Sequence, residues 1–414
     1  MKTLSLLAKL LVRRHGEQKE TLPEIDAFLD TRTGVWCHGA IPPNLKQEIA
    51  SSIKDDSGIA RPFSETYLRE VVLDTDGFKV VKMALRVFLK LSVAIIGDKK
   101  AAKGGPIYPW AQALCISPDL SVNACAQLSV DSRAATVFYT INAGVFVTLA
   151  HRFLAMFADE DFLQDMSNAP LRKSGPQVDK DPLGNACCSL RPNNENLLAI
   201  VTWLTAFAAL EILSHEQAHF YRGHLGYLRD QGKGVRLSEA DDDGHLCFPE
   251  NTNLRRRLEL DADEGAGMMF SVFMREFDHP VPGPKDGQNE RFFVFTVVAA
   301  VCTFLLFEER QPSGFYYPPA WRVQHFFGGF VRDFFESAGS DEEQSELHGV
   351  VSTVIEHVQA RCEDLGWSDK FNFSDMKRWL HLLTEEDQPG RLALDNDLKR
   401  FMPHVWPEDR THIR

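Results

Sequence analysis

The chain has 414 residues, of which 44% are hydrophobic, 25% charged and 10% aromatic, a globular composition with room for two or three structural units. The formal net charge of −13 and the pI of about 5.6 argue against a nucleic-acid-binding surface. Eight cysteines without a CxxC pair exclude a disulfide scaffold and indicate a reduced, cytoplasmic protein with core thiols.

The N-terminal segment is predicted to be an amphipathic helix rather than a signal peptide. Leu4, Leu7 and Leu11 fall at helical spacing, while the apolar run is interrupted by a lysine and lacks a small-residue cleavage site. Residues 1–105 read as a mostly helical N-terminal region, with a strongly periodic helix around Phe78–Ile96.

The linker-like segment Gly97–Gly105 precedes residues 106–340, which hold the apolar helices and every histidine–carboxylate motif. After a polar segment at Glu336–Glu346, residues 341–414 read as a C-terminal helical tail. Three stretches rich in turn residues are predicted as long loops: Asn168–Asn196, Asp230–Asn253 and Asp278–Asn289. Long loops in compact domains are often functional, so these loops could form the walls of a cleft or gate it.

Two apolar runs, Leu197–Leu210 and Phe292–Phe307, approach the length of a membrane span. A spanning helix needs about 20 apolar residues, so both runs fit buried core helices better. The second run, at 16 residues, comes close enough to that length to keep an integral-membrane protein open as an alternative.

The first of these runs leads into the motif HExxH, formed by His215, Glu216 and His219. On a helix, positions i and i+4 differ by about 40°, so both imidazoles face one way and could bind one metal ion. Glu216 lies about 100° round from His215, beside the metal, where it could accept a proton from an activated water molecule. The plain alternative is a core helix with two buried histidines.

A second predicted helix, Arg255–Phe270, offers a third ligand. Glu259 and Asp263 are again four residues apart, and we assign Glu259 to the metal and Asp263 to holding a ligand imidazole by its other N–H. Small residues on this helix would let it approach the histidine helix closely: Ala262, Gly265, Ala266 and Gly267.

Two further polar residues on the histidine helix have less defined roles. His224 is about 180° from His215 on a continuous helix, so we exclude it as a ligand of the same ion. Glu211, one turn before His215, could hydrogen-bond that imidazole, or could extend its carboxylate to the surface.

HExxH followed by ExxAD at Glu259–Asp263 resembles the gluzincin metallopeptidases, in particular the HtpX and CAAX-prenyl-protease family. Segment "VNACAQ" (Val122–Gln127) is similar to that family's cleft-lining edge strand, and "ATVFYTINAGVFVTLA" (Ala135–Ala150) to the strand-to-helix turn after it. The segment "YYPPAWRVQH" (Tyr316–His325) resembles the family's HPP…R segment, with Arg322 in the place of the arginine. The missing membrane spans point towards soluble relatives such as the phage-exclusion (Lit-type) peptidases.

The resemblance implies an α+β, predominantly helical fold with a zincin-like catalytic domain at residues 106–340, comprising an active-site helix, a short edge-stranded sheet and flanking helical segments. It also implies one Zn²⁺ per chain and hydrolysis of a protein or peptide. Because a broad protease would be hazardous in the cytoplasm, we expect a narrow substrate. The charge argues against a nucleic-acid partner, and no membrane contact is expected. Five side chains are candidates for stabilising the transition state: Tyr316, Tyr317, Arg322, His325 and His245.

Three alternatives stay open at this stage. The chain could be an integral-membrane peptidase of the CAAX/HtpX kind, or a hydrolase that uses the same chemistry on another bond. It could also be an interaction or toxin-like protein with a structural zinc site, for which Cys247 is the nearest candidate fourth ligand.

Overall fold

The computed structural model describes residues 29–30, 35–38, 110–117, 122–131, 134–157, 178–180, 186–188, 195–232, 236–238, 252–276, 288–308, 316–335, 341–366 and 388–399. Most of these residues are helical and the rest of the regular structure is strand, so the predicted α+β, predominantly helical class is confirmed. The expected N-terminal helix, the periodic helix at Phe78–Ile96 and the linker at Gly97–Gly105 lie outside the described residues.

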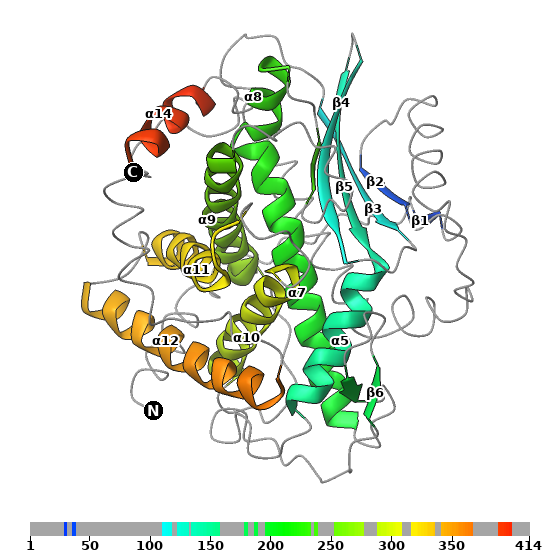
Figure 1. The fold of residues 1–414 in the computed structure, drawn as a ribbon, viewed down its shortest axis with the longest axis vertical. Coiled ribbons are helices and arrows are strands. Elements are labelled where there is room, and N and C mark those ends of the chain that lie inside the picture. Colours follow the sequence, from blue (N-terminus) through cyan, green and yellow to red (C-terminus); the bar gives the residue numbers. More distant parts are fainter. Residues whose placement is uncertain are drawn as a thin grey trace.

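A six-stranded sheet forms one side of the molecule, with the strand order β1-β2-β3-β5-β4-β8 (Figure 1). β3 and β5 are parallel, and the other neighbours are antiparallel. Alternate residues of β5, namely Val137, Tyr139 and Ile141, are buried in the core, as expected for a strand with one face against helices. The strands are β1 (Leu29–Asp30), β2 (Val35–His38), β3 (Trp110–Ser117), β4 (Ala124–Asp131), β5 (Ala134–Asn142) and β8 (Arg236–Ser238).

The sheet corrects two of the sequence expectations. β4, which contains most of the "VNACAQ" segment, is not the edge strand, because β8 pairs with it at Cys125, Ala126 and Gln127. The segments predicted as long loops also contain strands. Of the three segments, Asp230–Asn253 holds β8. Asn168–Asn196 holds a separate hairpin of β6 (Val178–Lys180) and β7 (Ala186–Cys188). Short strands of three residues carry too little alternation to be recognised in a sequence.

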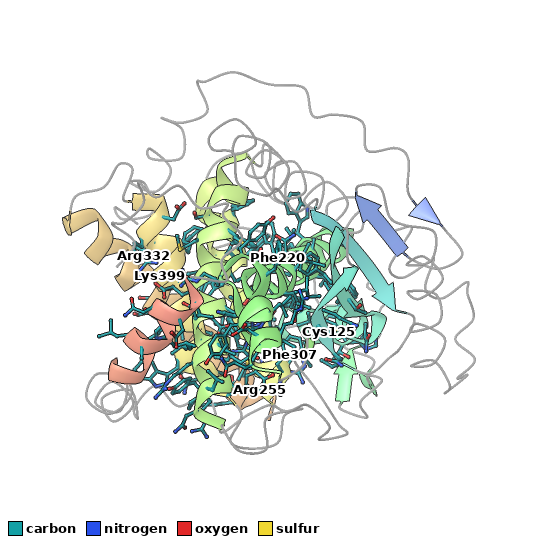
Figure 2. The ribbon with its side chains drawn as sticks, turned by 90° about the horizontal axis from the view of Figure 1, so that it is seen from above. Cys125, Phe220, Arg255, Phe307, Arg332 and Lys399 are labelled. Atoms are coloured by element: carbon teal, nitrogen blue, oxygen red, sulfur yellow. The ribbon has the colours of Figure 1, made fainter. Side chains whose placement is uncertain are left out.

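Helix α7 (Glu195–Tyr221) runs through the middle of the fold, with β4 and β5 on one side and α9 (Thr252–Glu276) and α10 (Gln288–Glu308) on the other (Figure 1). In the view from above, Cys125 of β4 and Arg332 of α11 lie on opposite sides of α7 (Figure 2). The strand-to-helix turn predicted after β5 is present, since Asn142 ends β5 and α5 begins at the next residue. The remaining helices are α5 (Ala143–Phe157), α8 (His224–Asp230), α11 (Pro319–Phe335), α12 (Asp341–Asp364) and α14 (Gln388–Leu398).

α10 is a core helix, as the sequence predicted. Every side chain from Phe292 to Phe307 is buried, against aromatic partners that include Phe207 of α7 and Phe326 of α11. In the described part of the chain, no helix combines the length and the apolar character needed to cross a membrane.

α12 begins at Asp341, inside the polar segment that the sequence suggested as a boundary. It contacts α10 and α11, and its buried residues join the same hydrophobic core. Arg361 of α12 also donates to the backbone carbonyls of Ala155 and Met156 in the last turn of α5. The described part of the C-terminal tail is therefore packed onto the region that carries the histidines.

Glycines on α9 allow two close helix contacts. A Cβ on Gly265 would lie 3.0 Å from Ala218 Cβ of α7, the close approach that the sequence predicted. Gly267 faces α11 instead of α7, because a Cβ there would lie 1.8 Å from the backbone oxygen of Phe326. Gly329 of α11 is its counterpart, with a Cβ position 2.0 Å from the backbone oxygen of Glu264. α9 and α11 therefore touch backbone to backbone.

Candidate metal centre

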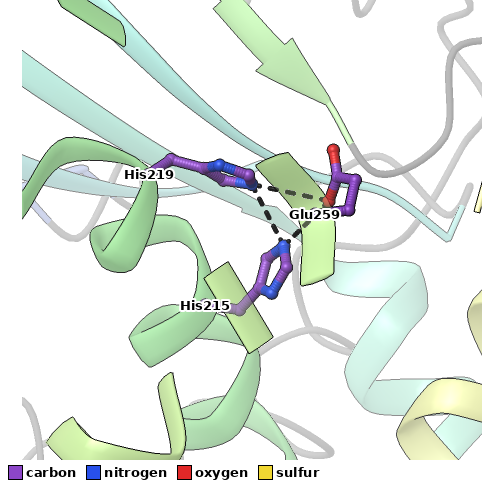
Figure 3. A group of neighbouring side chains, drawn as sticks. All are labelled: His215, His219 and Glu259. Atoms are coloured by element: carbon purple, nitrogen blue, oxygen red, sulfur yellow. Dashed lines mark hydrogen bonds and ion pairs between the residues drawn. The ribbon is translucent and has the colours of Figure 1, made fainter. Parts of the chain in front are cut away.

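α7 and α9 bring together the three side chains that the sequence predicted as metal ligands (Figure 3). His215 Nε2 lies 3.1 Å from His219 Nε2 and 3.1 Å from Glu259 Oε2, and His219 Nε2 lies 3.5 Å from the same oxygen. All three residues are buried, at no more than 3% exposure. Among the residues that the structure describes, this is the group whose ligand atoms could hold a metal ion.

Charge and burial set the protonation of this group. Burial lowers the pKa of His219 to about 4, so its imidazole is neutral at neutral pH. Burial acts to raise the pKa of Glu259, but His219 and His215 outweigh it and hold that pKa well below its ordinary value. The site therefore offers a carboxylate and neutral imidazole nitrogen, the protonation states that a metal requires.

Asp263 lies where the sequence placed it, beside the other nitrogen of His215. His215 Nδ1 is 2.8 Å from Asp263 Oδ1. Both oxygens of Asp263 also accept hydrogen bonds from Arg322 of α11, at 2.9 Å from Nε and 3.0 Å from Nη2. A charged carboxylate next to Nδ1 favours the proton on that nitrogen, which leaves the Nε2 lone pair facing the group.

His224 occupies a position that the continuous-helix prediction did not foresee. α7 ends at Tyr221, and Gly223, with φ of 83°, turns the chain so that α8 begins at His224. His224 Nδ1 then lies 2.8 Å from His219 Nδ1, on the side of that ring away from Glu259. His224 is not part of the metal-binding group, as expected, but it contacts one of its members.

Asp261 is the next member of this contact chain, and the sequence analysis missed it. Its Oδ2 lies 2.8 Å from His224 Nε2, and its two oxygens also accept hydrogen bonds from Arg222. Asp261 sits within the ExxAD segment, two residues after the candidate ligand Glu259, so the signal was a third carboxylate on that helix. Its partner could not be found without knowing where α7 ends.

Glu216 is buried on α7, at 1% exposure, and is not among the three residues whose ligand atoms converge. Burial raises the pKa of Tyr139 of β5 well above its ordinary value, and the charges of Tyr221 and Glu216 raise it further.

Glu259 also has an arginine neighbour on its own helix, which the sequence analysis did not single out. Arg255, one turn earlier, has its Nε 3.8 Å from Glu259 Oε1 and donates a 2.6 Å hydrogen bond from Nη2 to the Tyr316 hydroxyl. The Tyr316 ring lies between two guanidinium groups, 5.2 Å from Arg255 Cζ and 5.0 Å from Arg322 Cζ. Tyr316 thus links the arginine beside Glu259 to the arginine beside Asp263.

The other candidates for transition-state stabilisation take different positions. Arg322 binds Asp263 with two nitrogens, which gives it a supporting contact. Tyr317 packs in a small apolar cluster with Leu260 and Trp321, and the His325 ring lies 6.1 Å from the Trp321 ring. His245 and Cys247 lie outside the described residues.

Glu211 is buried, so the expectation that it could extend to the surface is wrong. Burial raises the pKa of Glu211 well above its ordinary value, and the nearby carboxylate of Asp263 raises it further, although Arg322 and His215 act in the opposite direction.

Comparison of the chain with protein-family models, curated proteins and solved structures found no match. The gluzincin resemblance therefore rests on the motif residues of the sequence.

Proposed function

We propose that the chain is a zinc-dependent endopeptidase with a zincin-like, gluzincin-type catalytic domain. The observation that carries this proposal is the convergence of two imidazole nitrogens and one carboxylate oxygen at 3.1, 3.1 and 3.5 Å. Unprotonated atoms this close repel one another unless a proton or a metal cation lies between them, and one metal ion would satisfy all three at once.

The ligand chemistry favours zinc over the common alternatives. Ligand bonds of 2.0–2.1 Å in tetrahedral geometry place ligand atoms about 3.3–3.4 Å apart, close to the separations within this group. Magnesium and calcium prefer oxygen ligands, whereas two imidazoles and one carboxylate form a typical catalytic zinc set. Three protein ligands leave one coordination position for water or substrate.

In the proposed mechanism, zinc supplies Lewis-acid activation of a water molecule and of the scissile carbonyl. His215, His219 and Glu259 hold the metal, and Asp263 with Arg322 fixes the His215 ring. Glu216 accepts the proton of the attacking water and returns it to the leaving amine. The buried position of Glu216 next to His215 on α7, without a place among the ligand atoms, supports this role.

The burial of the site bears on its substrate. The three ligand residues and Glu216 are at most 3% exposed, so the site presents little open surface to polypeptides in general. This supports activity that is gated or directed at a narrow protein target. A protein that degraded casein and unrelated unfolded proteins freely would contradict that part of the proposal.

The same burial favours one second candidate, a structural metal site without catalysis. Structural zinc sites are closed and usually have four protein ligands. The two candidates differ at Glu216, since a structural site has no use for a carboxylate that is not a ligand.

Cleavage of proteins in a cell lysate tests the proposal. Purified native protein should generate new protein N-termini, detected by mass spectrometry, and a zinc chelator should abolish them. Glu216→Gln should generate none, and Glu356→Gln, the same change on the exposed face of α12, should behave as the native protein does. Identical N-termini from the native and Glu216→Gln proteins would contradict the proposed role of Glu216.

A further inference from the structure

A chain of polar contacts runs away from the metal-binding group behind His219. His219 Nδ1 lies 2.8 Å from His224 Nδ1, and His224 Nε2 lies 2.8 Å from Asp261 Oδ2. The contact between two ring nitrogens is short enough to be a hydrogen bond, so it contains one proton. The His224 side chain is fully buried, at 0% exposure, which makes an unsatisfied nitrogen there costly.

The position of that proton follows from the neighbouring contacts. A neutral imidazole has one N–H and one lone pair, and a metal ligand needs its lone pair on the coordinating nitrogen. Because His219 Nε2 faces His215 and Glu259, its proton lies on Nδ1 and is donated to His224 Nδ1. His224 then carries its own proton on Nε2, where it donates to Asp261.

We propose that His224 is a positioning residue that fixes the tautomer and ring orientation of His219, and that Asp261 in turn fixes His224. This inference rests on the proposed function, because it needs a metal at His215, His219 and Glu259. It assigns to a neutral imidazole the supporting role that Asp263 has on the other histidine.

Asp261 is suited to anchor this chain because Arg222 also holds it. Arg222 donates a hydrogen bond to each of its two carboxylate oxygens, from Nε and from Nη2. Arg222 also lies 3.6 Å from Glu264, which pairs with Arg332 of α11 at 2.6 Å. The far end of the chain is therefore an ion-pair network that connects the α7–α8 turn to α9 and α11.

The break between α7 and α8 is what creates the contact. On an uninterrupted helix His224 would lie about 140° round from His219 and could not reach its Nδ1. Gly223 adopts the left-handed conformation that glycine accepts at little cost, and His224 begins the next helix at a new angle.

Two substitutions at His224 test its two hydrogen bonds separately. His224→Leu removes both bonds. His224→Asn keeps the acceptor for His219, because Asn Oδ1 takes the position of His Nδ1, but it removes the donor to Asp261. Loss of such a supporting partner typically weakens metal binding by about 10–100-fold. We expect zinc affinity to fall by that factor in His224→Leu and to stay within about 10-fold of native in His224→Asn. Asp261→Asn should lose less zinc affinity than His224→Leu.

The experiment is a titration of metal-free protein with Zn²⁺ against a chromophoric chelator, with the visible spectrum of the Co²⁺-substituted proteins as a second readout. His357→Leu, the same change at an exposed position of α12, is the control and should keep both native values. The Co²⁺ spectrum of His224→Leu should differ from that of the native protein, because a freed His219 ring changes the ligand geometry. A general loss of stability would not change the spectrum of the folded fraction, and Asp261→Asn carries the test if His224→Leu does not fold.

Native zinc affinity and a native Co²⁺ spectrum in His224→Leu, with no binding in His219→Ala, would overturn this inference and leave the proposed function standing. Equal losses in His224→Leu and His224→Asn would overturn the acceptor role of His224. Absence of zinc binding in the native protein would overturn the proposed function and this inference together.

Discussion

The two histidines of the metal-binding group are supported in different ways. His215 has a carboxylate, Asp263, beside its second nitrogen, and an arginine of α11 holds that carboxylate. His219 has the imidazole of His224 beside its second nitrogen, and the carboxylate of Asp261 lies one ring further away. One support depends on the packing of α11 on α9, and the other depends on a turn at the end of α7.

This difference predicts that the two sides will respond unequally to substitution. A carboxylate attracts the N–H of a ligand ring more strongly than a neutral ring nitrogen does, so the His215 side should contribute more to metal affinity. It should also be more sensitive to distant changes, because Arg322 reaches Asp263 only while α9 and α11 remain in close contact.

The largest effect is expected for Gly329→Ala, which tests the α11 side. A Cβ there would lie 2.0 Å from the backbone oxygen of Glu264, so α11 must move away from α9. We expect a loss of about 3 kcal/mol in the free energy of unfolding, measured with urea, and weaker zinc binding as Arg322 shifts. Gly328→Ala is the matched control, since its Cβ meets nothing within 4 Å. Equal stability of the two variants would show that the helix contact is looser than described.

The next effect is expected for Asp263→Asn, which should lower stability as well as zinc affinity, because the buried Arg322 loses its charged partner. The amide keeps the shape but removes the charge that holds the His215 ring, and zinc affinity should fall by about 10–100-fold. Asp364→Asn, an exposed change on α12, should leave the affinity unchanged. If the His215 side contributes more to metal affinity, Asp263→Asn should lose more zinc affinity than Asp261→Asn in the same chelator titration. The reverse order would contradict this comparison.

The smallest effect is expected for Gly223→Ala, which tests the turn on the His219 side. A left-handed φ of 83° costs an alanine about 1 kcal/mol, so stability to urea should fall by that amount. Gly366→Ala introduces similar strain at φ of 68°, beyond the end of α12. Both variants should lose similar stability, but only Gly223→Ala should also lose zinc affinity. Unchanged affinity in Gly223→Ala would show that His224 does not depend on this turn.

The His215 side was predictable from the sequence because regular helices govern it. HExxH and the pair Glu259 and Asp263 both rely on i, i+4 spacing, and the helices that carry them are long, at 27 residues for α7 and 25 for α9, so the spacing applies without interruption. Burial of α10 followed from its length and composition in the same way. In each case a local rule and the tertiary structure agree.

The His219 side could not be predicted because it depends on where a helix ends. A glycine at position 223 is a signal for a helix end, but a glycine inside a helical pattern is also tolerated, and the helical wheel then places His224 on the wrong side. The three-residue strand β8 and the facing of Gly267 towards α11 were missed for a related reason, since each depends on a partner distant in sequence.

The measurement that tests the central claim most directly is the metal content of the purified protein by mass spectrometry, for the native chain, Glu216→Gln and His219→Ala. The account predicts one zinc per chain in the native and Glu216→Gln proteins and none in His219→Ala, because Glu216 is not a ligand and His219 is. Absence of metal from all three proteins, after growth with added zinc, would contradict it and leave α7 as a core helix with two buried histidines.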